Sequence, residues 1–265
     1  MNPFRHLRPL ALRDWAFSRF GARLGPAPET APGRGWPLVY GGRMPALCPT
    51  DVAHRRLAWT GLYDLPLSRQ IARLARSGGL LLDVGANAGY FTILWCAARA
   101  DNRVAAFEPC PANVRLLRQN LAANGWESRV QVHPVAAGRG KGSLPFMPGP
   151  AGQTGWGGLA PSIGSSQLPA ATFPVPVCSL DQLFPHRPRI RVLKVDTEGA
   201  DAWVIQGARG LLARGCIEQV FFEENLERMQ ALGIEPGTAA GVLRECGYRV
   251  VCLEGGEVGG WEAVR

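Results

Sequence analysis

The sequence predicts an α/β fold, in which helices cover both faces of a twisted, mostly parallel sheet. Three observations support this prediction. Short apolar runs alternate with segments of helical periodicity from about residue 61 to the C-terminus. The run "GLLLDVGA" is short and unbroken up to Asp83, which is typical of a strand buried on both faces. Acidic or glycine-rich residues follow the runs, at the end of the sheet where such folds bind ligands.

The expected elements follow in strict alternation. Strands are predicted at residues 79–86, 103–109, 129–138, 190–196, 217–225 and 248–255, with the tail 259–265 pairing beside the last of them. Helices are predicted at residues 61–76, 90–100, 111–125, 200–215 and 236–247. Residues 61–265 would thus form the main domain, with a Gly/Pro-rich insertion at about 138–176. Residues 1–60 would be an N-terminal extension, at least partly helical, that faces substrate or a partner.

Composition indicates a folded chain and limits the classes of partner that it is expected to bind. The 265 residues are 46% hydrophobic and 19% charged, and the 33 glycines and 22 prolines are too few for general disorder. The net charge of +8 comes mostly from scattered arginines without a long basic run, which disfavours nucleic acid as a partner. Seven cysteines without a C-x-x-C pair and four dispersed histidines favour reduced thiols in a cytoplasmic protein.

The N-terminal segment lacks the apolar core of a secretory signal, and no run of about 18 apolar residues could span a membrane. This segment is Arg-rich, and as a helix it could be a transit peptide or could meet a membrane or a partner; packing over the domain is the preferred prediction. The sequence leaves open whether the chain forms a homo-oligomer.

The stretch "LLLDVGANAGYF", residues 80–91, reads as a strand, a tight turn and a helix. Asp83, Gly85, Ala86, Asn87 and Gly89 follow or end the strand, where glycines allow a close backbone approach and helix N-terminal amides can hold an anionic group. A structural turn without a ligand is the alternative.

Glu108 ends the next strand, 25 residues beyond Asp83, where a carboxylate can accept hydrogen bonds from both hydroxyls of a ribose. A nucleoside ligand is therefore the leading hypothesis, although an acid at this position would also favour the dipole of the following helix. The G-x-x-x-G spacing differs from the dinucleotide fingerprint and disfavours a nicotinamide-dependent oxidoreductase.

Three segments in this order resemble the FkbM family of S-adenosylmethionine-dependent methyltransferases, which have the Rossmann-like class I methyltransferase fold. They are "LLDVGANAGYFT", "VAAFEPCPANVRLLRQNLAANG" and "VLKVDTEGADAWVIQGA". The third segment departs mildly from the family pattern at Thr197 and Asp201. The resemblance implies S-adenosylmethionine as cofactor. Its methionine end would be held by Asp83, Gly85, Ala86, Asn87 and Gly89 and its ribose by Glu108. Phe91 and Pro109 would shape the pocket, and Ala136 would lie beside the adenine.

Carboxylates at two further strand ends are the candidate catalytic residues. Asp196 is expected nearest the reacting centre, and Glu198 or Glu223 would act as a base or orient the substrate, since a hydroxyl acceptor must lose its proton. A helix-capping role for Glu198 is the alternative. No metal site is predicted, although the three carboxylates could instead hold Mg²⁺.

Three further residues are candidates for structural or auxiliary roles. Lys194 is predicted to form a structural ion pair, and His133 ranks as a second candidate base. Trp156 would be either a lid or an exposed loop anchor.

The resemblance implies O-methylation of a hydroxyl on a small molecule, a sugar or glycan, or a secondary metabolite. The basic charge keeps methylation of RNA or protein as an alternative. A non-catalytic, cofactor-binding interaction module is the alternative from another class.

Overall fold

The computed structural model describes residues 3–25, 27, 34–161, 171–253 and 260–265. Its centre is a seven-stranded sheet with the order β12-β13-β11-β10-β3-β4-β5. The strands are β3 (Leu80–Val84), β4 (Arg103–Phe107), β5 (Val130–His133), β10 (Ile190–Val195), β11 (Ile217–Glu223), β12 (Arg249–Cys252) and β13 (Gly260–Val264). The five strands from β11 to β5 are parallel, and β13 runs antiparallel to both of its neighbours. The predicted α/β class and mostly parallel sheet are confirmed.

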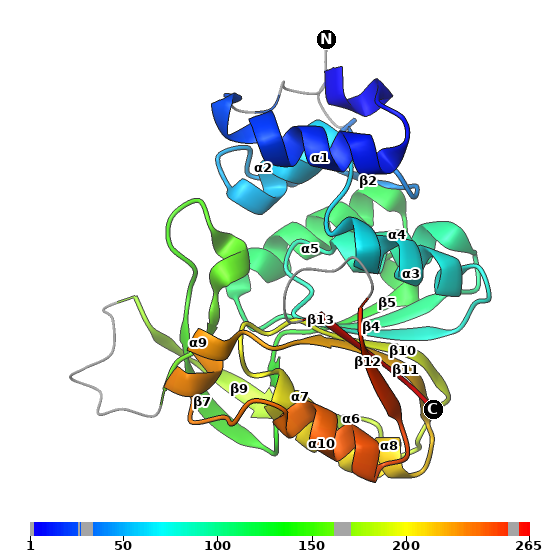
Figure 1. Ribbon diagram of the computed structural model, residues 1–265, viewed down its shortest axis with the longest axis vertical. Helices are drawn as coiled ribbons and strands as arrows, with labels where there is room; N and C mark the ends of the chain where they lie inside the picture. The colour runs from blue at the N-terminus through cyan, green and yellow to red at the C-terminus, as the bar shows by residue number, and fades with distance from the viewer. Residues whose placement is uncertain (1–2, 26, 28–33, 162–170, 254–259) are drawn as a thin grey trace.

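Helices cover both faces of this sheet (Figure 1). One face carries α3 (Leu65–Ala75), α4 (Tyr90–Ala98) and α5 (Pro111–Asn124); the other carries α6 (Leu180–Leu183), α7 (Asp201–Gln206), α8 (Arg209–Ala213) and α10 (Thr238–Glu245). Two apolar cores result, because the central strands turn side chains to both faces. Leu81 and Ile93 belong to the first core, and Leu193 and Val204 to the second; all four are 0% exposed.

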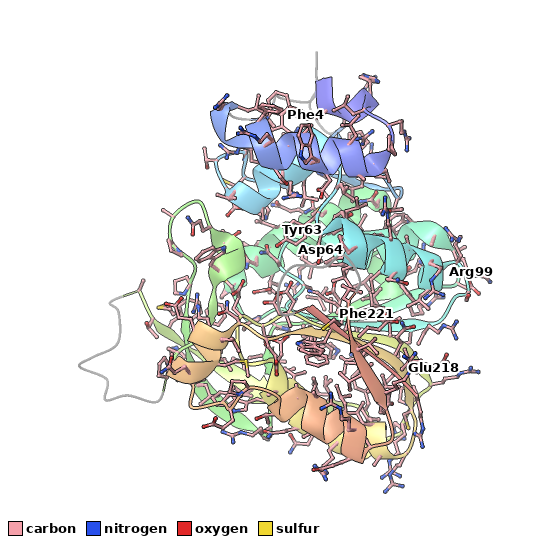
Figure 2. All side chains as sticks on the ribbon, viewed as in Figure 1. Phe4, Tyr63, Asp64, Arg99, Glu218 and Phe221 are labelled. Atoms are coloured by element: carbon pink, nitrogen blue, oxygen red, sulfur yellow. The ribbon has the colours of Figure 1, made fainter. Side chains whose placement is uncertain are left out.

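The N-terminal residues add a layer above α3, α4 and α5 (Figures 1 and 2). It contains α1 (Leu10–Phe20), α2 (Val52–Thr60), the 3-10 turns η1 (Pro3–His6) and η2 (Gly21–Arg23), and the short strands β1 (Trp36–Pro37) and β2 (Arg43–Met44). The ring of Phe4 meets the rings of Phe17 and Trp59 edge-on, at centroid distances of 5.8 and 6.0 Å. These aromatics share the apolar core of α3 and α4, so the layer is packed onto the domain.

The predicted insertion contains a small sheet of its own, with the order β6-β9-β7-β8. Its elements are β6 (Ala136–Ala137), β7 (Gly142–Met147), η4 (Thr154–Trp156), β8 (Gly158–Leu159) and β9 (Phe173–Cys178). Residues 162–170 of the insertion lie outside the described residues. The single strand predicted over 129–138 is wrong, because β5 ends at His133 and β6 joins the small sheet. Pro134 stands at the break and has no N–H for a ladder hydrogen bond.

Several boundaries differ from the sequence prediction. The helix predicted over 200–215 is divided into α7 and α8, and the single-turn helices η3 (Glu127–Arg129) and α9 (Leu226–Ala231) were not predicted. The tail does pair beside β12, as predicted, and it also separates β12 from β11. All seven cysteines are free thiols. Among the described residues, no helix is long and apolar enough to cross a membrane.

Candidate functional site

A cavity lies at the carboxyl ends of β3, β4 and β10, where parallel strands of an α/β sheet direct their following loops. The turn after β3 forms one wall with Gly85, Ala86 and Asn87. Gly85 has φ of +75°, and a Cβ atom there would stand 1.8 Å from the carbonyl oxygen of Asp196. Only glycine therefore allows β3 and β10 to end this close together.

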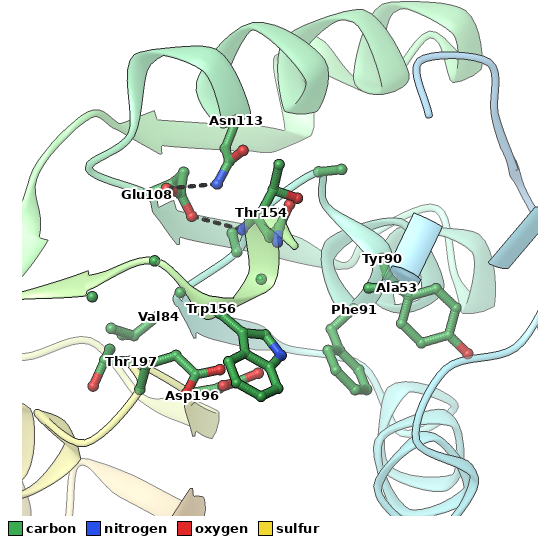
Figure 3. A pocket seen from close by; sticks show the side chains of 18 of the residues that line it. Ala53, Val84, Tyr90, Phe91, Glu108, Asn113, Thr154, Trp156, Asp196 and Thr197 are labelled. Carbon is green, nitrogen blue, oxygen red and sulfur yellow. Dashed lines mark hydrogen bonds between the residues drawn. The ribbon is translucent and has the colours of Figure 1, made fainter. Parts of the chain in front are cut away.

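The carboxylate of Glu108 ends β4 and lines the same cavity (Figure 3). Its two oxygens accept hydrogen bonds from the backbone N–H groups of Asn87 at 2.8 Å and Cys110 at 2.9 Å, and from Nδ2 of Asn113 at 3.3 Å. Burial raises the pKa of Glu108, and these donors act against the rise. The side chain is thus fixed beside the glycine-rich turn.

Lys194 is the cation at the centre of the strand ends. Its side chain is 2% exposed, and its Nζ lies 3.2 Å from Asp83 Oδ1 and 3.4 Å from Asp196 Oδ2. Nζ also donates a hydrogen bond to the carbonyl of Gly85 at 3.0 Å. Although burial acts to lower the pKa of Lys194, the two carboxylates outweigh it and raise the pKa. The predicted structural ion pair of Lys194 is confirmed.

Three carboxylates converge next to this ion pair. Asp196, Glu198 and Glu223 each place one oxygen within 4.8 Å of the oxygens of the other two. They come from the ends of β10 and β11, which are neighbours in the sheet. Such a cluster must reduce its charge repulsion by holding protons or by binding a cation.

Proton retention is favoured by the surroundings of two of these carboxylates. Burial, followed by the charge of Asp196, raises the pKa of Glu198 to about 7, although Asn225 Nδ2 donates to Glu198 Oε2 at 3.1 Å. The charge of Asp196 and then burial also raise the pKa of Glu223. Glu198 is therefore a group that can exchange a proton near neutral pH.

Asp201 fixes the backbone that carries these acids. It is buried, and its carboxylate accepts hydrogen bonds from the N–H groups of Thr197 and Glu223, both at 2.9 Å. The contacts hold the loop after β10 against the end of β11. Burial raises the pKa of Asp201.

Residues far away in sequence form the roof of the cavity. Asp51 is 0% exposed and caps α2, where its Oδ1 accepts from the N–H of His54 at 3.0 Å. Its Oδ2 accepts from the N–H of Thr154 at 2.6 Å and from the Thr154 hydroxyl at 2.9 Å. The N–H of Val52 also donates to the carbonyl of Gly152 at 2.8 Å. The N-terminal layer and the insertion are therefore tied together above the cavity.

His54 and Trp156 complete the lining from these two segments. The Nδ1 of His54 accepts from the N–H of Cys48 at 3.1 Å, so Nε2 carries the proton that points to Asn87 Oδ1 at 3.4 Å. Burial lowers the pKa of His54, which keeps the ring neutral. Trp156 is 59% exposed, and in the view of Figure 3 its indole lies in front of Asp196 with Phe91 beside it.

The structure brings most of the predicted site residues to one cavity. Those lining it are Gly85, Ala86, Asn87, Phe91, Glu108, Pro109, Ala136, Asp196 and Glu198. Asp83, Gly89 and Glu223 do not line it. Asp83 is buried against Lys194 and the hydroxyl of Thr92, and Gly89 lies under Leu117.

His133 also lies outside the lining of the cavity. Its ring stacks on Phe107 at a centroid distance of 4.6 Å. No sequence pattern predicted Asp51, His54 or Thr154 as site residues, because only long-range contacts bring them to the cavity.

An α/β sheet with a glycine turn after β3, an acid after β4 and the cavity between them defines a Rossmann-like domain of the nucleoside-binding class. Residues 83–250 match the sequence model of the family described as the methyltransferase FkbM domain. That match covers more than half of the chain, and the chain belongs to the FkbM methyltransferase family. The predicted family and its class I methyltransferase fold are confirmed.

The relatives are distant. "Methyltransferase 1" of Beauveria bassiana (strain ARSEF 2860) is 28% identical over 149 residues, a match that spans 48% of this chain and 57% of the relative. A solved methyltransferase FkbM from Methylobacillus flagellatus KT has a TM-score of 0.47 and 14% identity, covering 71% of this chain and 44% of that one. The O-methyltransferase TomG from Streptomyces achromogenes, solved in complex with SAM, has a TM-score of 0.45 and 15% identity, covering 83% and 88%.

Proposed function

We propose that this FkbM-family methyltransferase uses S-adenosylmethionine to methylate a hydroxyl group of a small molecule, a sugar or glycan, or a secondary metabolite. The observation that carries the proposal is the position of Glu198 and Asp196 in the same cavity as Glu108 and the glycine turn. A nucleoside held near Glu108 would leave the part of the cavity near Asp196 and Glu198 free for an acceptor with exchangeable protons.

The residues of the cavity fit this cofactor. Glu108 offers a buried carboxylate for the ribose hydroxyls, and the turn at Gly85 offers the close backbone approach that the methionine end would need. Pro109 and Ala136 give apolar surface for the base. When bound, S-adenosylmethionine supplies a methyl group on a positively charged sulfur, which departs as a neutral thioether.

The acidic cluster would handle the proton of the acceptor. Methyl transfer to a hydroxyl releases that proton, and Glu198, with a pKa of about 7, can accept it near neutral pH. Glu223, whose pKa is raised chiefly by the charge of Asp196, does not line the cavity, so it would act on the acceptor only through Asp196 or Glu198, whose oxygens lie within 4.8 Å of its own. Asp196, held 3.4 Å from Lys194, would position the hydroxyl.

Trp156 and the roof would exclude water from the reaction. The Asp51–Thr154 hydrogen bonds tie the two segments of the roof together, and Trp156 lines the cavity, with its indole in front of Asp196 in the view of Figure 3. Exclusion of water strengthens the electrostatic contacts at the reacting atoms and prevents water from competing with the acceptor.

The test is transfer of labelled methyl groups from S-adenosylmethionine to a panel of sugars, small hydroxyl compounds, RNA and protein. We expect a hydroxyl compound to be labelled. Turnover should be lost in Asp196→Asn while affinity for S-adenosylhomocysteine is retained, and Glu198→Gln should lower turnover most at neutral pH. Asp101→Asn, on an exposed ion pair with Arg99, is the matched control.

Three results would contradict the proposal in different ways. Unchanged turnover in Asp196→Asn would remove that residue from the reaction. Label in RNA, with binding that weakens steeply as salt is added, would favour the nucleic-acid alternative. Cofactor binding without transfer to any class of acceptor would favour a non-catalytic module.

A further inference from the structure

The outer surface of α1 combines exposed apolar side chains with arginines that form no ion pair within the part of the chain that the structure describes. Leu12 and Trp15 lie one turn apart and are 41% and 58% exposed. Phe20, 41% exposed, meets Trp15 edge-on at a centroid distance of 6.0 Å. Three of the six large hydrophobic side chains found exposed among the described residues thus gather on this one helix. We call Leu12, Trp15, Arg19 and Phe20 the α1 surface.

The opposite side of α1 explains why these side chains stay exposed. Arg13 is 4% exposed and its Nη1 donates to the carbonyl of Thr60 at 2.9 Å, while Asp14 forms an ion pair with Arg56. Phe17 is buried against Phe4. The helix is therefore held to α2 by its inner side, and the α1 surface is presented outward at a defined orientation.

The charge around the α1 surface is positive. The first 25 residues contain five arginines and one acid, Asp14, whose charge is already paired. Arg8, Arg19 and Arg23 are exposed, and the Arg19 guanidinium lies 5.7 Å from the centroid of the Phe20 ring. Aromatic and leucine side chains flanked by arginines are what a helix needs to lie in the headgroup region of an anionic lipid bilayer.

We propose that the α1 surface docks the protein on anionic lipid membranes, with Trp15 and Phe20 inserted at the headgroup level and Arg8, Arg19 and Arg23 near lipid phosphates. A second copy of this chain is disfavoured as the occupant, because each copy carries a net charge of +8 and would bring arginine against arginine. Among the described residues no helix could span the bilayer, so attachment would be peripheral.

Docking would bring the cavity close to the lipid. Phe17, on the inner side of α1, lines one edge of the cavity, so about one helix diameter, roughly 10 Å, would separate that edge from the membrane surface. The proposal concerns the surface alone and does not depend on which reaction the cavity performs.

The test is co-sedimentation of the full chain with vesicles of phosphatidylcholine alone and of phosphatidylcholine mixed with phosphatidylglycerol. We expect binding to the mixed vesicles, weakened by salt. Trp15→Ala with Phe20→Ala should weaken binding at least tenfold. Leu226→Ala is the control, because Leu226 is 58% exposed and lies on α9, which is far from α1 in Figure 1.

Arginine variants test the charge separately. Arg19→Glu with Arg23→Glu should weaken binding by more than about 25-fold, since each basic residue near an anionic surface contributes about fivefold. Arg115→Glu with Arg118→Glu, on the exposed side of α5, makes the same change of charge elsewhere and should have a smaller effect.

Circular dichroism and thermal unfolding would show that each variant keeps the fold. The proposal is overturned if wild type ignores the mixed vesicles, or if the variants and their controls lose binding equally. It is also overturned if the protein is a dimer without lipid and Trp15→Ala makes it a monomer, since the α1 surface would then be an interface between copies.

Discussion

Replacement of Lys194 by methionine should destabilise the protein strongly. Methionine keeps the length and most of the apolar volume of the side chain but removes its charge. Asp83, 1% exposed, would keep a buried carboxylate without its cation at 3.2 Å, and the carbonyl of Gly85 would lose its donor. Asp196 would suffer less, because its side chain is 33% exposed and water can replace the lost contact.

The expected loss is about 3–5 kcal/mol of unfolding free energy, the range found when one partner of a buried ion pair is removed. Urea unfolding followed by circular dichroism would measure it. The double variant Lys194→Met with Asp83→Asn should recover part of the loss, because it no longer buries an unpaired carboxylate.

Arg209→Met is the matched control. Arg209 pairs with Glu245 on the surface, where the two side chains are 55% and 61% exposed, and its loss should cost less than about 1 kcal/mol. A loss below about 1 kcal/mol for Lys194→Met, or no recovery in the double variant, would refute the reasoning that a buried ion pair joins β3 and β10.

Three further predictions concern the acidic cluster and the roof. Because the pKa of Glu198 is raised to about 7, its contribution to stability is present below the unfolded pKa and is lost as pH rises through 7. Urea unfolding should therefore give a lower unfolding free energy at pH 8 than at pH 5, and Glu198→Gln should make this difference smaller by about 1–2 kcal/mol. An equal difference in wild type and variant would contradict this prediction. Thr154→Val keeps the shape of the side chain but removes the hydroxyl that donates to Asp51. It should lower the unfolding free energy by about 1–2 kcal/mol and weaken binding of S-adenosylhomocysteine several-fold, whereas Thr154→Ser should retain the stability and the affinity. Equal behaviour of the two variants would contradict the role of this hydrogen bond in closing the cavity. A chelator should leave turnover unchanged, because Lys194 already places a positive charge 3.4 Å from Asp196, and loss of activity restored by Mg²⁺ would contradict this.

The central part of the fold follows from local sequence patterns. The run before Asp83 is apolar throughout, the run before Asp196 is apolar except for Arg191 and Lys194, and the structure buries both as neighbouring parallel strands. Because ligand cavities lie at the carboxyl ends of such strands, Glu108 and Asp196 could be assigned to one site from their positions alone.

Other features depend on contacts that no local pattern contains. Nothing in residues 130–137 other than Pro134 indicates that β5 and β6 belong to different sheets. The hydrogen bonds between Asp51 and Thr154 join positions 103 residues apart, so the roof could not be predicted. Asp83 was expected at the ligand, yet the structure surrounds it with Lys194 and Thr92, because the strand turns that side chain into the protein.

The sequence also did not show which side of α1 would be exposed. Packing of this helix over the domain was predicted, and its buried Phe17 agrees with that prediction. The sequence could not show that Trp15 remains outside, because both sides of the helix carry large apolar residues.

The most direct test of the account is titration calorimetry of S-adenosylhomocysteine with wild type and with Glu108→Ala. Wild type should bind S-adenosylhomocysteine and not NAD. Glu108→Ala should lose roughly 100-fold in affinity, since hydrogen bonds to a charged group contribute about 1.5–3 kcal/mol each. Glu127→Ala, at an exposed glutamate, should bind as wild type does. Binding of NAD, or equal affinity of wild type and Glu108→Ala, would contradict the assignment of the cavity to S-adenosylmethionine.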